Sequence, residues 1–253
     1  MKRFSRLFIL CFGLALLATG GCKKLSTDTS ILVLNVYPYF GNDSIVPGKI
    51  YRTAVGDSIS FSRADFYISN IQLNGTSGTS ISDSGYTLVT FSNHQNLIVG
   101  SVPTGNYNSI SFNVGVTSSL NHIDPATYAA GPLAAQSPSM HFADNNTGYI
   151  FMAFEGAVDS TNNNASPNKL FSYHIGTDSL LHTVNLPDHS AAPYNSVFTA
   201  TGTKVLTINI IADFSQLLQN VNTSTSTLTN TTDNTVLADT LAAHIPVMFR
   251  YQQ

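Results

Sequence analysis

The chain of 253 residues has 11 basic and 14 acidic residues, and 43% of its residues are hydrophobic. This length is enough for one sizeable domain with its own core. Because the basic residues are scattered singly and the net charge is −3, the composition gives no reason to expect binding to nucleic acid.

Residues 1–21 have the layout of a secretory signal. Three basic residues precede an apolar run at residues 7–18, which is too short to cross ~30 Å of hydrocarbon as a helix. The small residues 19–21 lead directly to Cys22. This junction resembles a bacterial lipobox, in which the signal is cut ahead of the cysteine and the cysteine is acylated. We therefore expect a lipoprotein anchored through Cys22.

The membrane is therefore an expected partner, because a cysteine that carries more than one acyl chain anchors a protein stably. The expected location is the cell envelope, as an outer membrane lipoprotein that faces the periplasm or the outside. Cys11 lies within the signal, so the mature chain has no second cysteine for a disulfide, and its net charge falls to −6. Residues 22–30 read as a tether, and residues 31–253 as a single domain.

After the tether the chain reads as a succession of strands. In residues 109–116, for example, Ile110, Phe112, Val114 and Val116 alternate with small or polar residues, which is typical of a half-buried strand. Turn-forming clusters of Gly, Asn, Ser and Pro separate such segments. Strands are predicted at 31–40, 58–73, 86–91, 96–102, 109–116, 149–158, 169–176, 205–214 and 245–251.

Helical periodicity is nearly absent. A helical turn is expected after Pro125, and another within residues 214–219, but neither is long enough to form a layer. Residues 220–240 are rich in Ser, Thr and Asn, which predicts a long surface loop. The pattern as a whole predicts an all-β fold, an antiparallel β-sandwich that is partly closed and Greek-key-like, with long loops.

Three of the seven histidines lie next to strand ends: His122, His141 and His174. Neutral imidazole suits copper and zinc, and the thioether of Met140 suits Cu(I). In residues 169–176, Phe171 and Tyr173 are expected to face the core and His174 the opposite side. No HxH, HExxH or CxxC spacing is present, so spacing alone does not establish a metal site.

Six motifs that follow one another along the chain give further information about its family. They are "ADFYISNIQL" (64–73), "VPTGNYNSISFNVGV" (102–116), "LNHIDP" (120–125), "MHFADNNTGYIFMAFEG" (140–156), "LFSYHIG" (170–176) and "AAHIPVMF" (242–249). In their order and spacing they resemble the MbnP-like family, proteins named for the copper-binding partner found with methanobactin systems. The resemblance runs from about Ile31 to the C-terminus.

The resemblance implies an all-β copper-binding protein outside the cytoplasm. His122 and His174 match two histidine ligands of the family, whose third ligand is an oxidised tryptophan. This chain has no tryptophan, so that ligand cannot form. His141 is the expected replacement, with Met140 a weaker one; the alternative is that the metal site has been lost.

The sequence leaves two alternative functions, a hydrolase and a surface-binding lipoprotein. A hydrolase needs a nucleophile with a base or two opposed carboxylates. Glu155, the only glutamate, is expected to be solvated, and no GxSxG motif is present, so we expect no enzyme. The second is a surface lipoprotein that binds glycan or protein without a metal. Asp-Ser/Thr-aliphatic triplets at 43, 57, 178 and 239 resemble the O-glycosylation signal of Bacteroidota and favour an extracytoplasmic chain.

Overall fold

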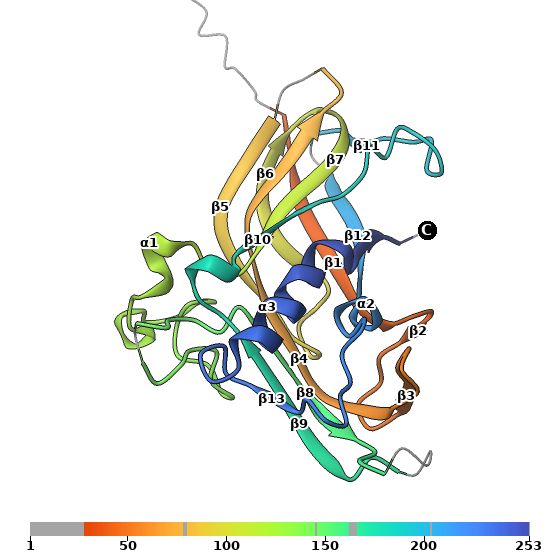
Figure 1. Ribbon diagram of the computed structural model, residues 1–253. Coiled ribbons are helices and arrows are strands. Elements are labelled where there is room, and N and C mark those ends of the chain that lie inside the picture. The colour runs from red at the N-terminus through yellow and green to blue at the C-terminus, as the bar shows by residue number, and fades with distance from the viewer. Residues whose placement is uncertain (1–27, 78–79, 145, 162–165, 203, 253) are drawn as a thin grey trace, which may run out of the picture.

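The computed structural model describes residues 28–77, 80–144, 146–161, 166–202 and 204–252. These residues form two curved β-sheets with short helices at their margins (Figure 1). The all-β, sandwich-like fold predicted from the sequence is confirmed. None of the helices in this described part of the chain is long and apolar enough to cross a membrane.

The smaller sheet is mixed, where the sequence had suggested only antiparallel pairs. β1 and β12 run parallel, in register from Ile31 opposite Val205 to Tyr39 opposite Asp213. A parallel pair needs a long crossover, and here the chain between β1 and β12 contains most of the larger sheet. The strands of this sheet are β1 (Thr29–Phe40), β2 (Asp43–Ser44), β6 (Leu97–Pro103), β12 (Val205–Asp213) and β14 (Phe249–Tyr251).

The larger sheet is built around one long strand, β4 (Ser58–Gly75), which has partners on both edges. A second parallel pair, β13 with β9, closes one end of this sheet. The other strands are β3 (Ile50–Arg52), β5 (Ser80–Val89), β7 (Gly105–Val114), β8 (Met152–Val158), β9 (Lys169–Ile175), β10 (His182–Asn185), β11 (Phe198–Ala200) and β13 (Leu228–Thr229).

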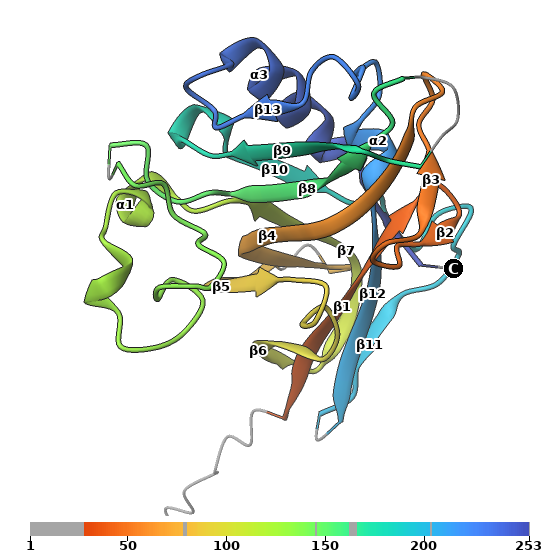
Figure 2. The same ribbon diagram turned by 90° about the horizontal axis from the view of Figure 1, so that it is seen from below.

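β4 pairs with β8 along its first half and with β7 along its second half. The change of partner falls at Tyr67, whose N–H donates to the Phe151 carbonyl and whose carbonyl accepts from the Gly115 N–H, both at 3.0 Å. The chain from residue 115 to residue 151 therefore leaves and rejoins the sheet at one place. We call this segment the β7–β8 connection; it carries three of the four sequence-predicted metal ligands (Figure 2).

The main core lies between the two sheets. Alternation in β1 turns Leu32, Leu34 and Val36 into it, each at most 2% exposed. In β9 the same alternation buries Phe171 and Tyr173 there, while Ser172 and His174 lie side by side on the opposite face. The facing predicted for this strand is confirmed.

The helical turns expected after Pro125 and within 214–219 are present, but the loop predicted for 220–240 is wrong over its last part. Residues 235–244 form α3, whose N-cap Asn234 side chain accepts from the Leu237 N–H at 3.2 Å. Its Leu237, Ala238, Leu241 and Ala242 are buried in the main core, because these four apolar residues share one face of the helix. The helices are α1 (Ser118–Asn121), α2 (Phe214–Leu217) and α3 (Thr235–His244), with 3₁₀ turns at Pro125–Thr127, Asp178–Leu180 and Ile245–Val247.

Candidate functional site

The β7–β8 connection covers part of the outer face of the larger sheet with a second apolar cluster. Tyr67 from β4 and Ala153 from β8 supply the sheet side of this cluster, and Leu133, Met140 and Tyr149 are among the residues that the connection adds. The layer therefore has a core of its own, separate from the one between the sheets. The β7–β8 connection carries His122, Met140 and His141, and of these Met140 lies in its apolar cluster. His174 projects from the same face of the sheet, because it is paired with Ala153.

His141 sits in a small hairpin within the connection. It forms an isolated antiparallel bridge with Tyr149, and the Phe142 N–H donates to the Gly148 carbonyl at 2.9 Å. Gly148 has a φ of +85°, and a Cβ at this position would clash with the carbonyl of Asn121. Glycine is needed there for both reasons, so the turn that presents His141 is held tightly against the end of α1.

The imidazole of His141 has one engaged nitrogen and one without a partner. Nδ1 is paired with the backbone carbonyl of Phe142, which can only accept, so Nδ1 carries the hydrogen. Nε2 is buried and has no hydrogen-bond partner. The ring also meets Tyr149 edge-on, with the centroids 4.9 Å apart. A buried lone pair without a donor is costly in an empty site, so this nitrogen is the strongest sign of a ligand in the layer.

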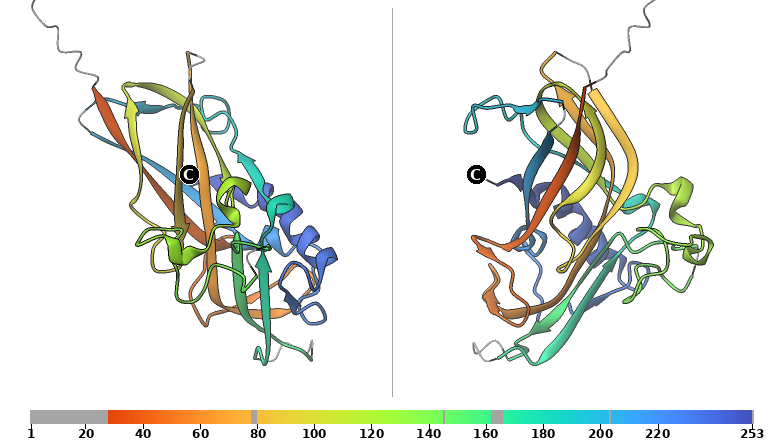
Figure 3. Two further views of the ribbon diagram at one scale, coloured as in Figure 1. Left: turned by 90° about the vertical axis from the view of Figure 1, so that its left-hand side faces the viewer. Right: turned by 180° about the vertical axis from the view of Figure 1, so that it is seen from behind.

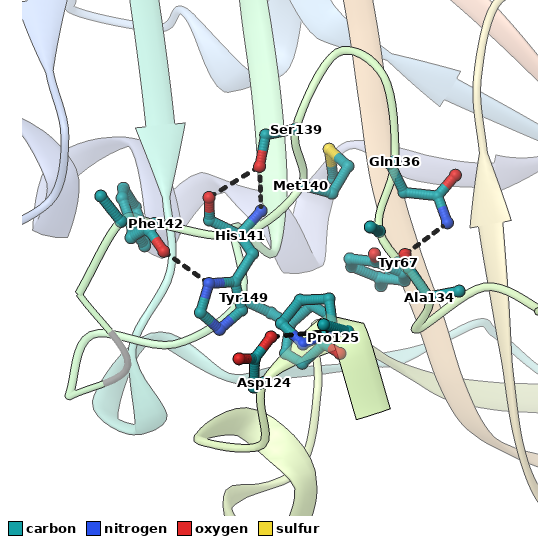
Figure 4. A pocket seen from close by; sticks show the side chains of 13 residues that line it. Tyr67, Asp124, Pro125, Ala134, Gln136, Ser139, Met140, His141, Phe142 and Tyr149 are labelled. Carbon is teal, nitrogen blue, oxygen red and sulfur yellow. Dashed lines mark hydrogen bonds between the residues drawn. The ribbon is translucent and has the colours of Figure 1, made fainter. Parts of the chain in front are cut away.

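A cavity of about 420 Å³ lies beside His141 (Figure 4). Asp124 and the imidazole of His141 line this cavity, and the rings of Tyr67 and Tyr149 form an apolar wall. Burial raises the pKa of the Tyr149 hydroxyl to about 12, with Tyr128 and Asp124 adding to the rise, so this phenol stays protonated and donates to the Leu133 carbonyl. The cavity is thus lined by one imidazole ring and one carboxylate in mostly apolar surroundings.

His122 follows α1 directly and lies beside the end of β9. Its Nε2 is 3.2 Å from Oδ2 of Asp178, in the 3₁₀ turn after β9, and both side chains are about two-fifths exposed. The neighbouring Asn121 amide donates to Oδ1 of Asp178 at 2.8 Å. Asp178 therefore joins the segment that carries His122 to the strand that carries His174.

His174 has hydrogen-bond partners at both ring nitrogens. Nε2 is 2.8 Å from Oε1 of Glu155, and Nδ1 is 3.0 Å from Oδ1 of Asn230. Glu155 also accepts from Nη1 of Arg63 at 2.9 Å, so this carboxylate is paired and only partly exposed, where the sequence suggested a solvated side chain. Burial by itself raises the pKa of Glu155, but the bonds from His174 and Arg63 outweigh it, and the pKa lies below its ordinary value.

Arg63 is the centre of this polar network and was missed in the sequence. Its side chain is 8% exposed and donates through Nε to Asp65 at 2.6 Å and through Nη2 to the Ser139 carbonyl at 2.9 Å. The same Nη2 lies 3.0 Å from the sulfur of Met140. Arg63 and Asp65 are the two charged residues of β4 and lie two residues apart, which places both on one face; that pair was the available signal.

The predicted ligands thus share one layer but not one coordination sphere. Met140 has its sulfur against a guanidinium, His122 and His174 pair with different carboxylates, and His141 faces its own cavity. Within the described ranges, no three His, Cys, Asp or Glu side chains are arranged to hold a metal ion. The ligand assignment stays a prediction, as does lipidation, because Cys22 lies outside the described residues.

The chain was compared with known proteins. The family model MbnP matches residues 29–236. Among solved structures, the chain is similar to MbnP from Methylosinus trichosporium, with a TM-score of 0.52, 14% sequence identity, and coverage of 76% of this chain and 78% of that chain. No curated protein matches the chain.

At this level of identity the structural likeness shows a shared fold. The family match is broader evidence, since it runs from the start of β1 into α3 and takes in the whole β7–β8 connection and β9. By this match the chain belongs to the MbnP family.

Proposed function

We propose that the chain binds copper outside the cytoplasm, anchored in the outer membrane by acyl chains on Cys22, and that it acquires, stores or hands over the metal without catalysis. Family membership supports a copper-related role through the resemblance described above. The N-terminal layout supports export and anchoring. A carrier rather than an enzyme fits a sequence without a hydrolase motif.

The observation that carries the proposal is the state of His141. Metal-binding histidines commonly donate one ring N–H to a backbone carbonyl or carboxylate, which fixes the tautomer and turns the other nitrogen toward the metal. In His141 the Phe142 carbonyl takes the Nδ1 hydrogen, and Nε2 is buried without a partner beside the cavity. Imidazole nitrogen is a ligand that suits copper.

His122 and His174 are the proposed further ligands. Each has a carboxylate at its ring, Asp178 for His122 and Glu155 for His174, and carboxylates of this kind orient metal-binding imidazoles. For His174 the metal would replace Asn230 as the partner of Nδ1. Met140 is the weakest member of the set, because its sulfur already accepts from Arg63. His141 would take the place of the tryptophan-derived ligand that this chain cannot make.

The test is a titration of the purified full chain with Cu(I), in competition with a chelator, and separately with Cu(II). We expect His141→Ala, His122→Ala and His174→Ala each to weaken binding by roughly tenfold or more. His94→Ala is the matched control, because its Nδ1 is likewise 2.8 Å from a backbone carbonyl, that of Phe91, but its ring lies beside Tyr37 of the smaller sheet.

Unchanged copper affinity in all three variants would refute the site. A chain that takes up neither oxidation state but gives a signal on a glycan array would favour the surface-binding alternative. The anchor is tested separately: Cys22→Ser should release the chain from the membrane fraction and abolish incorporation of labelled fatty acid.

A further inference from the structure

The outer face of the smaller sheet carries exposed apolar side chains at the end where β1 begins. Ile31, Ile98 and Val205 are 41%, 72% and 60% exposed. Ile31 is the partner of Val205 across β1 and β12, and Val33, next on that face of β1, is the partner of Ile98 on β6. Paired residues project to the same side of a sheet, so these four side chains share one surface, on which Val33 is buried and the other three are exposed. We call it the tether-end patch.

A polar row borders the tether-end patch on the same face. The Asn35 amide donates to Oδ1 of Asn209 at 2.8 Å, and Oδ1 of Asn35 accepts from the Asn96 N–H at 2.7 Å. Outward-facing positions of a sheet that meets water are usually polar, as this row is. The patch is therefore confined to the first residues of β1 and their partners, and contiguous exposed apolar groups of this kind mark interaction sites.

The beginning of β1 is firmly fixed to its neighbours. The Thr104 N–H donates to the Asp28 carbonyl at 3.1 Å, and the Ser30 hydroxyl donates to the Gly202 carbonyl at 2.8 Å. From Cys22 to Asp28 there are six residue steps, which span at most ~20 Å even when fully extended. If Cys22 is acylated, this end of the sheet cannot move farther than that from the lipid.

We propose that the tether-end patch rests on the lipid surface, so that the domain is held at two points, the acyl chains and the patch. The proposal rests on the anchor in the proposed function. Exposed Lys204 directly precedes Val205 at this end of the sheet, so its long side chain is within reach of lipid phosphates while the apolar side chains enter the interface. The β7–β8 connection lies well away from the start of β1 (Figures 1 and 3), which leaves the His141 cavity open to soluble partners.

The absence of tryptophan gives a clean test. Ile98→Trp places a single reporter in the patch, and Leu170→Trp, at a position 80% exposed near the start of β9 at the opposite end of the molecule, is the matched control (Figure 1). Both sites are mostly exposed, so the substitutions leave the core intact. The acylated full chains are reconstituted in phosphatidylcholine vesicles whose acyl chains are partly brominated, and the fluorescence is compared with that in unbrominated vesicles.

We expect bromine to quench the fluorescence of the Ile98→Trp chain roughly twofold and that of the Leu170→Trp chain hardly at all, because side chains in the interface reach the acyl boundary. Flotation of the vesicles reports the anchor separately. An Ile98→Trp chain that floats with the vesicles but is not quenched refutes contact between the patch and lipid, and supports the acyl anchor. If its tryptophan is also shielded from acrylamide, contact with lipid is again refuted, and a second copy of the chain covers this face. A chain that does not float refutes both the acyl anchor and the contact of the patch with lipid.

Discussion

Replacement of Arg63 by methionine tests the idea that one buried cation holds the candidate site to the sheet. The change removes the bonds to Asp65 at 2.6 Å, Glu155 at 2.9 Å and the Ser139 carbonyl at 2.9 Å, while a side chain of similar length remains. Two carboxylates, 11% and 29% exposed, are left without their cation. Breaking a buried pair costs about 3–5 kcal/mol, and the partial exposure of Glu155 favours the lower end, about 3 kcal/mol.

Urea denaturation followed by circular dichroism measures this loss. With a slope of about 3 kcal/mol per molar urea for a domain of this size, the midpoint should fall by about 1 M. Lys49→Met is the control: its pair with Asp43 is as short, at 3.0 Å, but both side chains are about half exposed, and water screens the interaction. That variant should unfold at nearly the wild-type midpoint.

A double-mutant cycle identifies the cause. If the loss comes from stranded carboxylates, Arg63→Met should cost clearly less in a chain that already carries Asp65→Asn and Glu155→Gln. An Arg63→Met midpoint equal to that of the wild type, or an equal cost in both backgrounds, would refute the reasoning.

Three further predictions concern the same layer and the core. Burial raises the pKa of Asp65 in spite of its guanidinium partner, so the stability that its protonated form contributes is present below the unfolded pKa and is lost as pH rises through the folded pKa. The urea midpoint of Asp65→Asn should therefore rise relative to that of the wild type between about pH 3 and pH 7. A constant difference between the two midpoints would contradict this. Leu241→Ala in α3 should cost about 2–5 kcal/mol in the same assay, since this side chain is fully buried; a loss below about 1 kcal/mol would mean that α3 is not part of the core. Gly148→Ala should lower the melting temperature more than Gly131→Ala, because both glycines have positive φ but only at 148 would the new Cβ meet the Asn121 carbonyl; equal shifts would exclude that clash as the cause.

The local pattern of the sequence was a good guide to the strands. Period-two alternation depends only on neighbouring residues, and it correctly predicted the long strands and the facing of Phe171 and Tyr173 against His174. It was less informative for α3, whose four buried apolar residues form a stripe that stabilises the helix only because the core lies beneath it. Ser, Thr and Asn around that stripe made the segment look like a loop.

The long-range pairings between strands could not be predicted from alternation or from motif spacing. The parallel contact of β1 with β12 joins residues far apart in the chain, and nothing local specifies it. The same holds for the candidate site: the motifs named His122, His141 and His174 as a set, but folding gave each ring a different neighbour.

The sequence by itself determined the strand content, the facing of side chains within strands, the family motifs and the signal-like pattern of the N-terminus, because these depend on short stretches of chain. Only the tertiary structure decided that Arg63 joins Asp65, Glu155 and the loop before His141, and that His141 has a buried ring nitrogen without a partner. The physical reason is that burial and charge pairing are set by segments that come close only when the sheet forms.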